Sequence, residues 1–301
     1  MEIDPLIREL GHDETSGSEA LVEQAAKIFV AFSGGFLTDD TDELARGIVD
    51  LGRKLLHARP NLAPLFHLVT ELYALAMEPV DIVMARRAIR MSAVDFTKTW
   101  SERVAKVAGR GAEQFGTGAH VLTVGRSDVV ERALLTAAQA GTLAGCVVGE
   151  GRPAWTGRSL TEALASRGAQ NVRLVPDLAL FSSLDDVDLV LVGTGAIRSE
   201  GAVMPAGTGA LVSAAKAAGK PAWLLSGVMT LLPGSAELPD AVVAGRPETV
   251  WERPPEGVAV ENHPFEVTPV TRFKGVILEN GENAPPDIVD RVHAMPVPPW
   301  V

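Results

Sequence analysis

Two glycine-bearing turns are the part of this chain best suited to bind a phosphorylated ligand. The apolar run at residues 187–192, a predicted strand, leads directly into Gly193-Thr194-Gly195, and Gly207-Thr208-Gly209 then opens an alanine-rich helix. Helix N-termini expose unpaired N–H groups and partial positive charge, and glycine lets an anion approach the backbone. The first turn carries no acid, base or nucleophile. The pattern therefore predicts binding more strongly than catalysis.

The other chemistry-bearing residues form no recognised metal or cofactor pattern. The histidines are not at ligand spacing, and the single cysteine, Cys146, lies within a predicted strand, where a small buried side chain is expected. The turn at Gly193 does not extend to a dinucleotide fingerprint, because the next position of that pattern falls on Arg198. The paired acids Asp39-Asp40 and Asp185-Asp186 fall where loops or helix caps are expected. We therefore expect no metal and no cofactor.

The composition of the chain argues against a nucleic-acid-binding protein and against a membrane protein. The net charge of −11 argues against a general nucleic-acid-binding protein, since neutralising phosphates needs a clustered basic surface. The sequence opens with Met1-Glu2-Ile3-Asp4-Pro5, without a basic and apolar targeting signal, and no apolar run reaches the roughly 20 residues that span a bilayer. We expect a cytoplasmic protein without a membrane partner.

The first hundred residues read as successive helices. Apolar residues recur at helical spacing over residues 18–32, 39–58, 62–77 and 80–107, and Pro60, Pro64 and Pro79 lie near the expected joints. A glycine-rich stretch from Gly109 to Gly118 then marks a boundary. We predict an all-helical N-terminal domain over residues 1–108 and a second domain over residues 109–301.

The second domain alternates strands with helices. Strands are predicted over 120–124, 145–149, 171–175, 187–192, 222–225 and 275–278, and helices over 127–140, 159–166, 208–218 and 285–292. Strands separated by helices of about ten residues are typical of a Rossmann-like, doubly wound parallel sheet. Right-handed crossovers place every strand-to-helix turn on one edge of such a sheet, where these folds bind ligands. The predicted fold class is therefore α/β with a helical N-terminal domain.

Several of these segments resemble a known family. Glu150-Gly151-Arg152-Pro153, followed by Gly157-Arg158-Ser159-Leu160, resembles its E-x-R-P…G-R-x-L segment, and Val190-Leu191-Val192-Gly193 with Gly201 and Gly207-Thr208 resembles its V-L-V-G-A-D…N-G…G-T segment. Phe265-Glu266-Val267-Thr268-Pro269 resembles its F-D-V-T-P element. The family comprises the α, β and δ subunits of eukaryotic translation initiation factor 2B, methylthioribose-1-phosphate isomerase and ribose-1,5-bisphosphate isomerase.

The resemblance covers nearly the whole chain in the same order. It implies a helical domain packed on a Rossmann-like domain, with a ligand cleft between them. It also implies a phosphorylated small molecule as ligand, a homo-oligomer formed through the C-terminal domain, and room for a protein partner.

The chain departs from the isomerases where the reaction occurs. Their cysteine after the first strand of the sheet falls on Gly125, and their aspartate in the G-A-D turn falls on Gly195. Their Asn-Lys pair falls on Met204-Pro205, and Pro205 removes a backbone donor. Moving a proton between C1 and C2 of a sugar phosphate needs a group that can give and take it, which glycine lacks. At these positions the chain is more similar to the regulatory subunits.

The features suited to phosphate are better preserved. Arginine forks, hydroxyls and helix N–H groups together make an anion cradle. Some of these residues also have an ordinary structural role: Arg158 as a surface charge, Ser16 and Ser18 as helix caps, and Arg59 as the partner of an acid between the domains. The candidates outside the two glycine turns are Ser16, Gly17, Ser18, Arg59, Arg126, Ser127, Arg152 and Arg158.

Two functions from different classes follow. The first is a regulatory or scaffold protein of the initiation-factor-2B type, which binds a sugar phosphate or nucleotide in the interdomain cleft without isomerase chemistry. The second is a sugar-phosphate aldose–ketose isomerase with relocated catalytic groups, for which Asp13, Glu14 and Glu150 are the candidate acids. The glycines at 125 and 195 favour the first.

Overall fold

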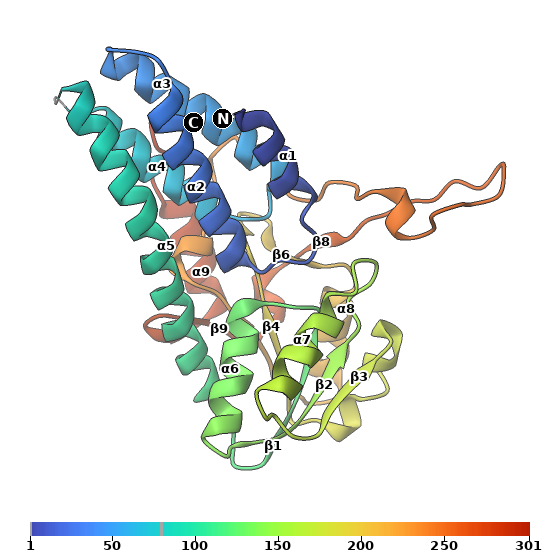
Figure 1. Ribbon diagram of the computed structural model, residues 1–301. Coiled ribbons are helices and arrows are strands. Elements are labelled where there is room, and N and C mark those ends of the chain that lie inside the picture. The colour runs from blue at the N-terminus through green and yellow to red at the C-terminus, as the bar shows by residue number, and fades with distance from the viewer. Residues whose placement is uncertain (1, 79–80) are drawn as a thin grey trace.

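The computed structural model describes residues 2–78 and 81–301 as a helical layer on an α/β layer, with the N- and C-terminal ends close together on the helical side (Figure 1). None of the helices described is long and apolar enough to cross a bilayer. The helical layer is built from α1 (Ile3–His12), α2 (Ser18–Gly35), α3 (Thr41–Ala58), α4 (Pro64–Ala76) and α5 (Ile82–Ala112).

The helices begin where the sequence provides caps. The Asp40 side chain accepts from Asp42 N at the start of α3, and Asp81 accepts from Val83 N and Met84 N at the start of α5. Pro64 stands in the first turn of α4, where its missing N–H costs nothing. Helix α1 was not among the predicted elements, and the predicted first residue of α5, Val80, lies outside the described residues.

Helix α5 continues beyond its predicted end. It runs through Gly109 and Gly111 to Ala112 instead of ending at Val107. A Cβ at Gly111 would lie 2.8 Å from Leu225 Cδ2, so this glycine permits close packing of the helix on the sheet and does not break the helix. The single helix α5 therefore packs against both layers.

The main sheet has the strand order β10-β9-β7-β4-β1-β2-β3 and is parallel except for β10. Its helices are α6 (Asp128–Gln139), α7 (Thr156–Ser166), α8 (Thr208–Ala217) and α9 (Pro285–Ala294). The strands are β1 (Ala119–Val124), β2 (Leu143–Gly149), β3 (Val172–Val175), β4 (Leu189–Gly193), β7 (Ala222–Leu225), β9 (Gly275–Leu278) and β10 (Gly281–Asn283).

Alternate residues of the central strands enter two separate cores. In β4, Leu191 packs into the cluster that holds residues of α5, α6 and α7, while Val190 and Val192 pack into the cluster that holds residues of α8 and α9. Strands that are buried on both faces consist of continuous apolar runs, and the central strands of this sheet have such runs in the sequence. The predicted doubly wound α/β class is confirmed, and Cys146 is buried in β2 as expected.

Two features of the C-terminal half were not predicted. A small antiparallel sheet forms from β5 (Ile197–Arg198), β6 (Gly201–Pro205) and β8 (Phe265–Thr268). In addition, the chain returns to the helical layer at its end, where the Trp300 ring centroid lies 5.2 Å from that of Phe66 and Trp300 Nε1 donates to Thr70 Oγ1 at 3.1 Å. The helical core is thus completed by residues from the other half of the sequence.

Candidate functional site

The sequence-predicted turns meet at one edge of the sheet. β1 is hydrogen-bonded to β2 on one side and to β4 on the other, so the chain order of the strands reverses between β1 and β4. Ligands of open α/β sheets bind outside the carboxyl ends of the strands at this switch point. Gly125-Arg126-Ser127 leaves β1 there, and Gly193-Thr194-Gly195 leaves β4.

The turn after β4 is covered by the backbone of the helical layer. Ala63 N donates to Gly195 O at 2.9 Å, and Arg198 Nη2 donates to Pro60 O at 2.9 Å. A Cβ at Gly195 would lie 2.4 Å from the carbonyl oxygen of Asn61. The α3–α4 connection therefore occupies the space that a side chain at position 195 needs.

The turn after β1 also excludes side chains. Gly125 has φ +62°, a conformation that favours glycine, and a Cβ there would lie 3.0 Å from Thr156 Oγ1. Ser127 Oγ packs where a Cβ of Gly193 would be, at 2.2 Å. Gly125 and Gly195, on which the resemblance places the cysteine and aspartate of the isomerases, thus lie where a side chain would meet neighbouring atoms.

The N-terminus of α2 holds an anion, and the anion is the chain's own Asp128. Asp128 accepts from Glu19 N at 2.8 Å and from Ser18 Oγ at 3.1 Å. A Cβ at Gly17 would lie 1.9 Å from Asp128 Oδ1, so glycine is required for this approach. Ser16 N donates instead to Asp13 Oδ1 at 2.8 Å. The predicted phosphate position at residues 16–18 is therefore filled by a carboxylate from α6.

A second carboxylate fills the loop between β2 and α7. Asp177 accepts from Gly151 N at 2.9 Å and from Arg152 N at 2.8 Å. The guanidinium carbons of Arg152 and Arg158 lie 4.4 Å and 3.6 Å from the ring centroid of Trp155. Both arginines are exposed, and each forms a cation–π contact with the same indole.

A third carboxylate fills the N-terminus of α8. Glu266 accepts from Gly207 N at 3.0 Å and from Gly209 N at 2.6 Å. Thr208 Oγ1 donates to Pro205 O at 2.6 Å, and Thr194 Oγ1 contacts the carbonyls of Ala196 and Val203 at 2.8 Å. Both threonine hydroxyls are thus engaged by the backbone.

Asp128, Asp177 and Glu266 were not among the sequence-predicted residues. Each accepts hydrogen bonds from backbone N–H groups in a segment that the sequence had suggested for phosphate. Asp128 follows Ser127 at the start of a helix, and Glu266 belongs to the quoted FEVTP segment, so both stood in recognisable motifs. Their contacts join residues far apart in the sequence, which no local pattern reveals.

Among the remaining candidates, Arg59, Asp13 and Glu14 have hydrogen-bond or ion-pair partners within the fold. Arg59 Nε donates to Leu10 O at 2.7 Å, and burial lowers the pKa of its guanidinium. Although burial acts to raise it, hydrogen bonds from Ser16 and Thr15 hold the pKa of Asp13 below its usual range. Glu14 pairs with Arg246 at 3.4 Å, and Glu150 is half-buried after β2. No cluster of His, Cys, Asp or Glu within residues 2–78 and 81–301 could hold a metal ion.

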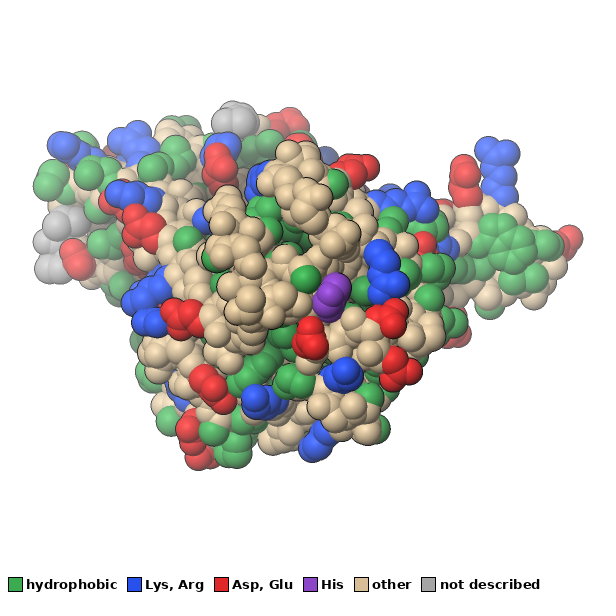
Figure 2. Space-filling view, turned by 90° about the horizontal axis from the view of Figure 1, so that it is seen from below, with side chains coloured by type: hydrophobic (Ala, Val, Ile, Leu, Met, Phe, Trp, Pro, Cys, Tyr) green, Lys and Arg blue, Asp and Glu red, His purple; other side chains and the backbone are tan. Residues whose placement is uncertain are grey.

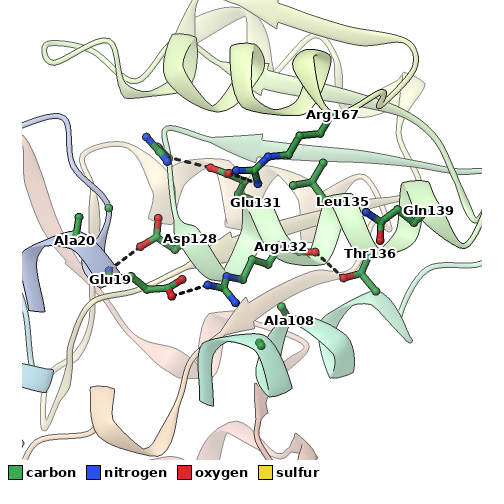
Figure 3. Close-up of a pocket in the computed structure, with 13 residues that line it drawn as sticks. Glu19, Ala20, Ala108, Asp128, Glu131, Arg132, Leu135, Thr136, Gln139 and Arg167 are labelled. Carbon is green, nitrogen blue, oxygen red and sulfur yellow. Dashed lines mark hydrogen bonds and ion pairs between the residues drawn. The ribbon is translucent and has the colours of Figure 1, made fainter. Parts of the chain in front are cut away.

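An open pocket of about 570 Å³ lies beside Asp128, where the two layers meet (Figure 3). Arg126 and Arg167 both pair with the buried Glu131, at 3.2 Å and 3.1 Å, and Arg132 pairs with Glu19. Of the sequence-predicted residues, Gly17 and Arg126 line it. Its walls are Gly17, Glu19 and Ala20 from the start of α2, Ala105 and Ala108 from α5, Arg126 from the turn after β1, Asp128, Glu131, Arg132, Leu135, Thr136 and Gln139 along α6, and Arg167 after α7.

The pocket is electrostatically balanced. Three arginines face three carboxylates, those of Glu19, Asp128 and Glu131. Burial raises the pKa of Glu19, against the opposing hydrogen bond from Ser101 and the charge of Arg132. The three arginines that line the pocket are therefore already paired with carboxylates.

The chain is similar over nearly its full length to proteins of two kinds. It is 26% identical over 286 residues to a Pyrococcus furiosus protein described as translation initiation factor eIF-2B subunit 2-like, which covers 93% of this chain and 96% of that protein. It is 26% identical over 280 residues to ribose 1,5-bisphosphate isomerase from Archaeoglobus fulgidus, covering 90% of this chain and 86% of that enzyme.

A solved structure shows the same fold. The translation initiation factor eIF-2B of Pyrococcus horikoshii superimposes with a TM-score of 0.82 at 21% identity, covering 95% of this chain and 98% of that one. The sequence model of the Initiation factor 2 subunit family matches residues 14–285. The chain therefore belongs to the Initiation factor 2 subunit family.

Proposed function

We propose that this chain is a regulatory or scaffold protein of the initiation-factor-2B type that does not isomerise sugar phosphates. The observation that carries the proposal is the turn after β4, where the carbonyl of Asn61 lies against Gly195. Isomerisation needs a group that gives and takes a proton, and neither Gly125 nor Gly195 supplies one. The steric closure at Gly195 also leaves no room for such a group.

Two of the three candidate acids, Asp13 and Glu14, give the isomerase alternative no support. Asp13 is engaged by the turn at Thr15 and Ser16, and its lowered pKa opposes proton uptake near neutral pH. Glu14 is paired with Arg246. A general acid or base works best when its pKa lies near the working pH. These contacts instead fit a loop that is held in place between the layers.

The proposal keeps a sugar phosphate or nucleotide as the ligand class to test at the junction of the layers. Arginine side chains favour that class, since Arg126, Arg132 and Arg167 line the pocket there. The backbone donors around it are already occupied, above all Glu19 N by Asp128. A phosphate must displace this carboxylate, so we expect weak binding.

Turnover is tested directly. Purified protein is incubated with ribose-1,5-bisphosphate or methylthioribose-1-phosphate, and the ketose product is followed. We expect no product above the rate without protein. Product formation that disappears in Asp13→Asn would overturn the proposal and establish the isomerase.

Ligand binding is tested by thermal shift against sugar phosphates and nucleotides. A ligand at a hundred times its Kd stabilises the fold by about 2.7 kcal/mol. We expect little shift for the wild type and a larger one for Asp128→Ala, in which the α2 N-terminus is free. Arg126→Ala should remove any shift that arises in the pocket, while Arg253→Ala, on an exposed loop, is the matched control. No shift in either protein would reject the ligand and leave an assembly role alone.

A further inference from the structure

A second pocket, of about 530 Å³, opens on the helical layer between the start of α1, the end of α2 and one face of α3. We call it the helical pocket. Its apolar walls include Ile3 of α1 and Phe32 and Phe36 near the end of α2. Ala20 lines the pocket at the junction of the layers and Phe32 lines this one, so about 18 Å of α2 separates the two, at about 1.5 Å per residue. The helical pocket is therefore a separate site.

One stripe of α3 forms the remaining side of the helical pocket. Six positions between Glu43 and Lys54 line it, at the three- and four-residue intervals that share one face of a helix. Gly47 stands near the middle of the stripe. A Cβ there would lie 2.7 Å from Phe32 Cζ and 3.1 Å from Phe36 Cζ, so the missing side chain brings both rings against α3.

The two phenylalanine rings form an aromatic wall. The ring centroids of Phe32 and Phe36 are 4.8 Å apart, and the ring planes are inclined by 29°. Both side chains are half-buried, so part of each ring stays accessible from the pocket. Offset aromatic pairs are favourable beyond the area that they bury. A flat aromatic ligand can therefore extend this stack.

Contacts from outside the pocket hold its walls in place. Arg86 Nη2, from α5, donates to Phe36 O at 2.6 Å and to Thr38 O at 2.8 Å, which fixes the end of α2. Lys54 Nζ lies 3.0 Å from Asp4 Oδ1 and ties α3 to α1 at the rim. A site that is already formed costs a ligand less ordering entropy than one that must be assembled.

The charged side chains of the wall leave one cation without a partner. The three carboxylates each lie beside a donor: Asp4 beside Lys54 at 3.0 Å, Asp50 beside Arg53 at 3.9 Å and Glu43 beside Thr38 Oγ1 at 2.5 Å. Among residues 2–78 and 81–301, Arg46 forms no ion pair and its side chain forms no hydrogen bond. A guanidinium fork matches the two oxygens of a carboxylate. The unpaired donor beside the ring stack therefore favours an anion.

We propose that the helical pocket binds a small aromatic carboxylate, with its ring against Phe32 and Phe36 and its carboxylate on Arg46. The volume suits a molecule of one or two rings, because small-molecule sites usually measure about 300 to 1,000 Å³. The site is independent of the sugar phosphate or nucleotide proposed for the junction of the layers. It is also independent of the absence of isomerase activity.

A ligand of opposite charge fits this wall less well. An aromatic amine would have to take Asp4 from Lys54 or Glu43 from the Thr38 hydroxyl, and it would leave Arg46 without a partner. Breaking an existing pair costs the new contact part of its gain, whereas a carboxylate on Arg46 breaks none.

The exposed side chain of Trp251 offers a poorer surface for such a ligand. Trp251 is 48% exposed and belongs to residues 250–259, which are all exposed on a segment that projects from the molecule (Figure 1). Figure 2 shows hydrophobic atoms gathered on this projection, with charged side chains at its margin. A small ligand there would be covered on one side only, whereas small-molecule sites bury most of the ligand's surface.

The test compares three probes that share an indole ring and a two-carbon linker: indole-3-propionate, tryptophol and tryptamine. Each is titrated into the full chain and followed by saturation-transfer NMR. We expect a Kd of about 1 mM or below for indole-3-propionate. Tryptophol and tryptamine should bind at least about fivefold more weakly, because only the carboxylate pairs with Arg46.

Arg46→Ala should remove this preference by bringing indole-3-propionate to the affinity of tryptophol, while the affinity of tryptophol stays unchanged. Arg90→Ala, at an exposed arginine of α5, is the matched control and should keep the preference.

The aromatic wall is tested with Phe36→Leu, which removes a ring and keeps an apolar side chain. All three probes should bind at least about threefold more weakly, and the preference for the carboxylate should stay. Phe181→Leu, at a phenylalanine that is 39% exposed in the α/β layer, should change nothing. Thermal melts of the variants show that each is folded.

Equal affinities of indole-3-propionate and tryptophol for the wild type would overturn the proposal, as would the absence of binding at about 10 mM probe. A preference that persists in Arg46→Ala would do the same. A preference that is lost in Arg126→Ala and kept in Arg46→Ala would also overturn it, since that result assigns the binding to the pocket at the junction of the layers.

Discussion

The turns after β4 and after β1 occupy equivalent places at the switch point of the sheet, yet the first is covered by the helical layer and the second borders an open pocket. The turn after β4 is sealed by the backbone of residues 60–63, which contacts Gly195 directly. The turn after β1 leads into Asp128 and an open pocket lined by arginines and carboxylates. The same sheet geometry therefore produces a closed contact on one side and a charged opening on the other.

The comparison shows that glycine in such a turn has more than one use. Gly195 lets a neighbouring layer approach, whereas Gly17 lets a carboxylate of the same chain approach a helix N-terminus. Positions that favour an anion are occupied by Asp128, Asp177 and Glu266. A sequence pattern that is typical of phosphate binding here provides N–H groups for the chain's own carboxylates, and these contacts stabilise the fold.

The largest effect is expected on the sealed side. Gly195→Asp places a Cβ 2.4 Å from Asn61 O and puts a carboxylate beside a carbonyl, so it should destabilise the protein by about 3 kcal/mol. Urea unfolding measures this. Gly116→Asp, where a Cβ meets nothing within 4 Å, is the matched control. A stable Gly195→Asp variant would show that residues 60–63 move aside easily and that the turn is not sealed.

On the open side, Asp128→Ala should cost about 1 to 2 kcal/mol. It removes the acceptor for Glu19 N and Ser18 Oγ and leaves the start of α2 uncapped. Denaturant unfolding compares it with Asp95→Ala, at an exposed acid of α5. Equal stability of the two variants would mean that the contact between Asp128 and α2 is incidental.

The stability of the protein should also depend on pH through His67, which lies in α4 after the residues that cover the turn following β4. Its Nε2 lies 2.9 Å from Leu231 O, and burial lowers the pKa of the imidazole below its ordinary 6.5. The unfolded chain then binds more protons as the pH falls below 6.5, so stability should fall there by at most about 1.4 kcal/mol per pH unit.

His67→Gln should flatten this part of the stability profile, measured by urea unfolding at several pH values. His263→Gln, at an exposed histidine, should leave it unchanged. An unaltered slope in His67→Gln would place the titrating group elsewhere.

The smallest effect is expected from Asp13 on the open side. Because its folded pKa is lowered from 3.8, its contribution is present above that value and is lost as the pH falls through the folded pKa. Asp13→Asn should cost about 0.5 kcal/mol at neutral pH, since the group is largely solvated, and nothing in strong acid. A loss that is independent of pH would mean that its charge is irrelevant to the turn.

The sequence predicted most of the regular elements because their signals are local. Buried strands such as 222–225 and 275–278 were predicted with their observed ends, since each is a short apolar run between breakers. The end of α5 was missed because Gly109 and Gly111 read as a break, although in the fold they allow close packing on β7. The sheet of β5, β6 and β8 was missed because its strands β6 and β8 are separated by residues 206–264, which contain α8 and β7.

The sequence predicted which turns lie together, and it did not predict which side chains surround them. Residues 125–127 and 193–195 do meet at one edge, as parallel topology requires. Of the predicted side chains, Arg126 lines the junction pocket, while Arg152 and Arg158 lie on Trp155. Which N–H groups remain free depends on carboxylates up to 109 residues away, as for Glu19 N and Asp128.

By itself the sequence determined the fold class, the order of the strands along the chain and the lack of a proton-transferring group at positions 125 and 195, because apolar periodicity and residue identity are local properties. Only the tertiary structure decided that Asn61 closes the turn after β4, that three carboxylates occupy the anion positions and that residues 250–259 stand exposed. These outcomes depend on which distant segments pack together, and packing is set by the whole chain.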